Sequence, residues 1–93
     1  MDKKPSRGTC SVSIRGRRWK VKWVSNLGDA VGTCDYDEQT IRIARGQTPE
    51  AELDTLIHEI IHAAVYDLDE VAVHATANAV SSALLKLGFV PKD

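Results

Sequence analysis

Two histidines in the second half of the sequence are spaced as metal ligands would be on a helix. Residues 58–62 read His-Glu-Ile-Ile-His, an HExxH motif. Four residues along an α-helix correspond to about 400°, so His58 and His62 leave the same face one turn apart. At that separation both imidazoles can bind one Zn²⁺ ion. Glu59 lies about 100° further round, where a carboxylate can act as general base towards a water on the metal. The motif therefore predicts a zinc site with Glu59 as its catalytic residue.

A catalytic zinc also needs a third protein ligand and an open position for water. The position six residues after His62, where longer HExxH patterns carry that ligand, is Leu68. The remaining candidates are His74 and Glu70. A turn at residues 67–69 would let a second helix fold back over the first, with Glu70 used in its cap. We therefore predict His74 as the third ligand, with Glu70 as the alternative.

The residues around the motif have the signals of a helix. Thr48 is a plausible N-cap and Pro49 a plausible first helical residue. Glu50 and Glu52 would interact favourably with the positive end of the helix dipole. The apolar positions that follow predict a wide buried face, made of Leu53, Leu56, Ile57, Ile60, Ile61 and Ala64.

A second helix is predicted to follow. Asp67 and Glu70, three residues apart, can form a capping box at its start, and Gly88 provides its end. The apolar residues that this helix carries are Val71, Ala75, Val80, Ala83, Leu84 and Leu87.

Before the first helix, apolar and polar residues alternate with the period of a strand. Cys10, Val12 and Ile14 alternate with polar residues, a turn is indicated at 15–17, and residues 18–23 alternate again. This pattern predicts a hairpin with Trp19, Val21 and Trp23 facing inward. Residues 31–35 and 40–44 predict a second hairpin, and its short second strand carries arginine, which is typical of an edge strand. The fold class predicted is α+β: a small, mostly antiparallel sheet of three or four strands, followed by two helices.

Length and charge limit the remaining possibilities. Ninety-three residues correspond to one domain, which we place at residues 10–93 after a disordered basic tail at 1–9. No apolar run approaches the roughly 18–20 residues of a membrane span.

Residues 1–24 hold eight of the twelve Lys and Arg residues. This run lacks a recognisable nucleic-acid module, so we expect a solvated strand face and no nucleic-acid partner. Cys10 and Cys34 have no metal-ligand spacing and fit reduced thiols in the cytoplasm.

Residues 55–64, Thr-Leu-Ile-His-Glu-Ile-Ile-His-Ala-Ala, resemble the active-site helix of zincin metallopeptidases. The layout of residues 30–85 resembles the small bacterial and phage-borne metallopeptidases of the SprT-like and ImmA/IrrE-like kinds. The resemblance implies a zincin-like fold, zinc-dependent hydrolysis of peptide bonds and a peptide or protein substrate, in a phage or prophage context. It also implies that the substrate runs along an edge strand, for which residues 40–44 are the candidate by chain order. SprT-type members have a final His followed by Gly, whereas Ala75 follows His74 here.

Two functions from different classes remain open. The first is a zinc metallopeptidase, in which Tyr36 or Tyr66 could stabilise the oxyanion and Asp54 could orient His58. The second is a regulatory or binding module in which the metal site is structural. Glu59 favours the enzyme, because a structural site has no need of a base at that position.

Overall fold

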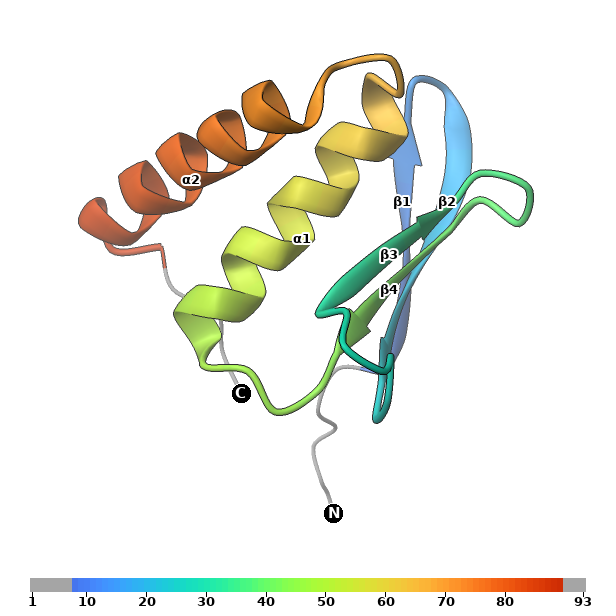
Figure 1. The fold of residues 1–93 in the computed structure, drawn as a ribbon, viewed down its shortest axis with the longest axis horizontal. Helices are drawn as coiled ribbons and strands as arrows, with labels where there is room; N and C mark the ends of the chain where they lie inside the picture. Colours follow the sequence, from blue (N-terminus) through green and yellow to red (C-terminus); the bar gives the residue numbers. More distant parts are fainter. Residues whose placement is uncertain (1–7, 90–93) are drawn as a thin grey trace.

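A four-stranded sheet with two helices on one side makes up the described part of the chain, residues 8–89, in this computed structural model (Figure 1). The order of elements confirms the predicted α+β class, with the strands preceding the helices. The sequence predicted a tail at residues 1–9. Of these, Thr9 belongs to the first strand, and residues 1–7 lie outside the described residues. The elements are β1 (Thr9–Ile14), β2 (Arg17–Val24), β3 (Gly32–Asp35), β4 (Thr40–Ala44), α1 (Pro49–Ala64) and α2 (Glu70–Lys86).

The first hairpin forms as predicted. β1 and β2 are antiparallel, with Val12 opposite Trp19. The two turn residues, Arg15 and Gly16, have φ angles of 53° and 80°. Positive φ at both positions is characteristic of the type I′ turn, whose twist matches that of the paired strands.

The position of β4 corrects the sequence-based expectation. The strand order is β1-β2-β4-β3, so β4 is an interior strand and the edge next to it is β3. β4 pairs in parallel with β2 and in antiparallel fashion with β3, which makes the sheet mixed. Ile41 and Ile43 of β4 are fully buried. Arg42 suggested an edge strand because it is charged. It lies between the buried Ile41 and Ile43, so its side chain leaves the opposite face of the sheet, and it forms ion pairs with Asp35 and Glu38.

The core lies between the sheet and α1. Its buried side chains come from β1, β2 and β4, and they include the predicted inward-facing Trp19, Val21 and Trp23. α1 begins at Pro49, and the Thr48 side chain accepts a hydrogen bond from the Ala51 N–H, as the cap signal predicts. The residues of α1 that pack on this core are Leu56, Ile60, Ala63 and Ala64.

α2 packs on α1 and contacts none of the described strands. Its buried side is narrow and consists of Val73, Ala77 and Ser81, which lie four residues apart. The larger apolar residues expected on this helix are mostly exposed, with Val71 at 80% and Leu87 at 72%. The apolar pattern of α2 therefore did not predict which of its residues are buried. Among the described elements α2 packs against α1 alone, so only the narrow side that faces α1 is covered.

Three basic residues of β2, Arg18, Lys20 and Lys22, project from the face of the sheet that the helices leave open. Arg18 and Lys20 are exposed and alternate with the buried Trp19 and Val21. This position agrees with a solvated strand face, while the absence of a nucleic-acid partner stays a prediction. Neither helix of the described residues is long and apolar enough to cross a membrane.

Candidate metal centre

Helix α1 brings the two histidines of the HExxH motif together on one face. His58 and His62 are both partly buried, and their rings meet edge to face with centroids 4.8 Å apart. The two Nε2 atoms are 3.2 Å apart. The helical spacing thus has the effect expected from the sequence, because both nitrogens point to a common position.

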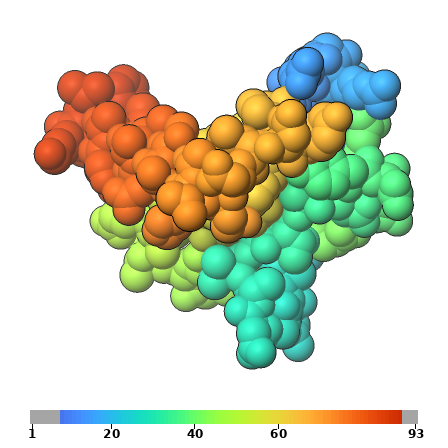
Figure 2. Space-filling model, turned by 45° about the horizontal axis from the view of Figure 1, so that its top comes forward, coloured from blue at the N-terminus to red at the C-terminus, as the bar shows by residue number. Residues whose placement is uncertain are grey.

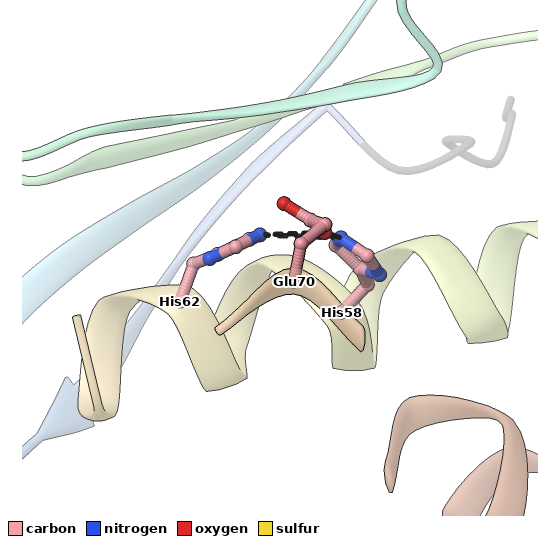
Figure 3. A group of neighbouring side chains, drawn as sticks. All are labelled: His58, His62 and Glu70. Carbon is pink, nitrogen blue, oxygen red and sulfur yellow. Dashed lines mark hydrogen bonds and ion pairs between the residues drawn. The ribbon is translucent and has the colours of Figure 1, made fainter. Parts of the chain in front are cut away.

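A carboxylate from the start of α2 joins this pair (Figure 3). The Glu70 Oε1 atom lies 2.9 Å from the Nε2 atom of His58 and 3.4 Å from that of His62. In a tetrahedral site with zinc–ligand bonds of about 2.0–2.1 Å, neighbouring ligand atoms are about 3.3–3.4 Å apart. The three atoms form a triangle of nearly that size, and nitrogen and carboxylate oxygen are both ligands that zinc accepts. His58, His62 and Glu70 could therefore hold a metal ion.

The start of α2 explains why the Glu70 carboxylate can face the histidines. The N-cap is Asp69, whose side chain accepts a hydrogen bond of 2.9 Å from the Ala72 N–H. The capping box predicted from Asp67 and Glu70 is therefore wrong. Because Asp69 satisfies the helix terminus, Glu70 becomes the first helical residue and its carboxylate is not used in a cap.

His74 lies at the border of this cluster. It follows Glu70 by one helical turn, its side chain is exposed, and its ring centroid is 6.3 Å from that of His58. Among the described residues, the group with ligand atoms within 4.8 Å of one another contains Glu70 and not His74. The structure thus places both candidate third ligands beside the HExxH histidines, and the choice between them stays a prediction.

Glu59 is buried where α1 faces the edge strand β3, with 7% of its surface exposed. Burial raises the pKa of its carboxyl group, while His58 and His62 act to lower it and Glu70 to raise it. A Cβ atom built on Gly32 of β3 would lie 2.9 Å from the Glu59 Oε2 atom and 2.7 Å from the Thr55 Cγ2 atom. Sequence reasoning missed Gly32, although an isolated glycine in a strand often marks a close approach.

The tyrosines and Asp54 take part in packing around the cluster. Tyr36 Oη donates a hydrogen bond of 2.7 Å to the backbone oxygen of His62, and burial is the main cause that raises the pKa of Tyr36 to about 12. Tyr66 is 71% exposed and meets the Tyr36 ring edge to face. Asp54 accepts a hydrogen bond of 3.1 Å from the Ser81 hydroxyl and so links α1 to α2. A role of either tyrosine at the oxyanion stays a prediction.

A family comparison agrees with this arrangement. The model of the SprT-like family matches residues 6–78, which include the HExxH motif, Glu70 and His74. The chain therefore belongs to the SprT-like family, which is related to the zincin-like metallopeptidases. Comparison of the chain with curated proteins and with solved structures gave no match. The ImmA/IrrE-like alternative and the phage context stay predictions.

Proposed function

We propose that this protein is a zinc-dependent metallopeptidase in which Glu59 is the general base. The observation that carries the proposal is the convergence of the His58 and His62 nitrogens beside a buried glutamate of the HExxH motif, with a further potential ligand from α2 next to them. Membership of the SprT-like family supports the same reaction class.

In the proposed site, His58 and His62 supply two ligands and α2 supplies the third. His74 is the proposed third ligand, because SprT-type chains carry a histidine after the HExxH helix and His74 is an exposed residue beside His58. Glu70 is the alternative, and its carboxylate already contacts both histidines. Zinc, when bound, would supply a Lewis acid that lowers the pKa of a coordinated water towards about 7 and polarises the substrate carbonyl.

Glu59 would move the proton in this reaction. Its carboxylate accepts a proton as the water oxygen attacks the carbonyl carbon, and it returns that proton to the amine nitrogen as the C–N bond breaks. Burial raises the pKa of Glu59, which makes the carboxylate a better proton acceptor than an exposed one. The charges of His58 and His62 act directly on this pKa, so the carboxylate lies within electrostatic range of the proposed ligands.

The edge strand next to α1 is the proposed binding site for the substrate backbone. Residues 40–44 cannot serve, because β4 is hydrogen bonded on both sides. β3 pairs with β4 on one side, contacts α1 and forms the edge of the described sheet. An extended peptide can add to such an edge through main-chain hydrogen bonds.

The decisive experiment compares wild type with Glu59→Gln, a nearly isosteric change at a residue that is not a proposed ligand. Zinc is measured by elemental analysis, folding by thermal unfolding, and hydrolysis by digestion of a peptide library. We expect both proteins to retain zinc and to fold, and we expect the variant to be slower by about 10²–10⁴-fold. Equal cleavage by the two proteins would refute the role of Glu59. Zinc-loaded wild type that cleaves no peptide would instead support the regulatory or binding module.

We also propose a cytoplasmic location with reduced thiols. Cys10 on β1 and Cys34 on β3 belong to opposite edges of the sheet. Three strand spacings of about 4.8 Å separate them, which is too far for a disulfide within the chain.

A further inference from the structure

A cavity of about 410 Å³ lies beyond the end of α1. The tip of the β1–β2 hairpin, the turn between β3 and β4 and the residues that follow α1 surround it; Figure 2 shows the blue hairpin tip beside the yellow-orange end of α1. Its lining includes three aromatic residues, Trp19, Tyr36 and Tyr66, and two arginines, Arg15 and Arg17.

The cavity has apolar walls and a cationic rim. Trp19 is 4% exposed, and Tyr36 packs edge to face against it with ring centroids 6.0 Å apart. Arg15 donates one hydrogen bond to the backbone oxygen of Ala64, which leaves further N–H donors of its guanidinium group. Within the described residues, neither Arg15 nor Arg17 forms an ion pair with a carboxylate. Two cations with no carboxylate partner among residues 8–89, set at the rim of an aromatic cavity, suit a ligand with a negative charge and an apolar stem.

The cavity and the candidate metal centre share the last turn of α1. Tyr36, which lines the cavity, donates a hydrogen bond to the backbone oxygen of His62, and the next residue along α1, Ala63, also lines the cavity. A peptide bound at the metal centre can therefore place a neighbouring side chain in the cavity, because successive residues of an extended chain advance by only about 3.3 Å.

We propose that this cavity is a specificity site for an acidic side chain of the substrate, near the peptide bond that is cleaved. The methylene groups of the substrate residue contact the tyrosine and tryptophan rings, and the carboxylate is bound by Arg17 together with Arg15. Guanidinium groups bind carboxylates through paired hydrogen bonds, which gives direction as well as charge. The proposal rests on the proposed function for its reaction, but the binding preference can be measured without any cleavage.

The test uses zinc-loaded Glu59→Gln and blocked pentapeptides that differ only in carrying Glu, Gln or Lys at one position. Binding is followed by NMR through the indole N–H resonance of Trp19. We expect the Glu peptide to bind at least about tenfold more tightly than the Gln peptide, and the Lys peptide to bind most weakly. The same peptides are then offered to the wild-type enzyme to compare their rates of cleavage.

Arg17 and Arg18 offer a matched pair of variants. They are adjacent in β2, but Arg17 lines the cavity whereas Arg18 lies on the opposite face of the sheet. Arg17→Glu should abolish the preference for the Glu peptide, while Arg18→Glu, with the same change in net charge, should alter it less than about twofold. Arg17→Gln provides a milder variant, and thermal unfolding of all three checks that each is folded.

Several results would overturn the proposal. Equal affinity for the Glu and Gln peptides would do so, as would an equal effect of Arg17→Glu and Arg18→Glu, which would indicate only long-range charge. The Gln peptide is also prepared with a free C-terminal carboxylate, and binding of that peptide as tightly as the blocked Glu peptide would also overturn it. Charge-selective binding without cleavage by wild type would refute the proposed function alone, whereas cleavage without a preference for Glu would refute the specificity site alone.

Discussion

The position of Glu59 depends on a residue that has no side chain. Gly32 of β3 lies against the Glu59 carboxylate and the Thr55 methyl group, where a Cβ atom would be 2.9 Å and 2.7 Å from their nearest atoms. Real Cβ atoms do not approach other heavy atoms so closely, so any side chain at position 32 must displace Glu59, Thr55 or the strand. Gly32 is thus a positioning residue for the proposed general base.

We therefore expect Gly32→Ala to lower kcat by about 10- to 100-fold, since small displacements of catalytic groups have effects of that size. Zinc content should change little, because the proposed ligands are untouched. Gly8→Ala is the matched control, as a Cβ at Gly8 would have no atom within 4 Å. Measurement of kcat and KM for both variants tests the role, and equal kcat values would contradict it.

At the scale of secondary-structure elements, the start of α2 determines which third ligand is available. Glu70 and His74 are one turn apart on this helix, and the cap at Asp69 fixes where the helix begins. A helix that began at the predicted capping box, two residues earlier, would have used the Glu70 carboxylate in its own cap. The observed cap leaves both residues able to contribute to the metal centre.

Paired variants of α2 distinguish the two candidates. If His74 is the third ligand, His74→Ala should lower zinc affinity at least tenfold, while Glu70→Gln should have a smaller effect. Zinc affinity is measured by competition with a chelator, and Asn78→Ala, one further turn along α2, serves as the control. The reverse order of effects would assign the third position to Glu70. If both variants lower zinc affinity only slightly, water rather than a third side chain completes the coordination of the metal by His58 and His62.

At the scale of the whole molecule, α2 depends on α1 for its packing. It contacts no described strand and buries only Val73, Ala77 and Ser81 along its length. A metal ion held by ligands from both helices would therefore connect α1 to α2, which bury few side chains against each other.

Zinc should accordingly stabilise the protein. A ligand that binds only the folded state contributes about 2.7 kcal/mol when its concentration is 100 times Kd. We expect the melting temperature to rise with added zinc and to fall with a chelator, as followed by circular dichroism. His62→Ala, which removes a proposed ligand, should show little response to either. A zinc-induced shift of equal size in that variant would argue against this metal site.

The sequence alone determined the features that depend on local interactions. Thr48 and Pro49 start α1, the turn at Arg15 and Gly16 joins the first hairpin, and the helical period places His58 and His62 on one face. Each of these follows from residues within about one turn or one hairpin of each other, so the chemical types and their spacing were sufficient.

Only the tertiary structure decided the features that depend on residues far apart in the chain. The parallel pairing of β2 with β4 moved β3 to the edge, and this brought Gly32 against Glu59. The cavity likewise combines the β1–β2 hairpin tip with Tyr36 and the end of α1. Strand order and helix packing are set by the summed burial of many side chains. The local patterns in each segment do not contain that information, because the same alternation of apolar and polar residues fits an edge strand and an interior one.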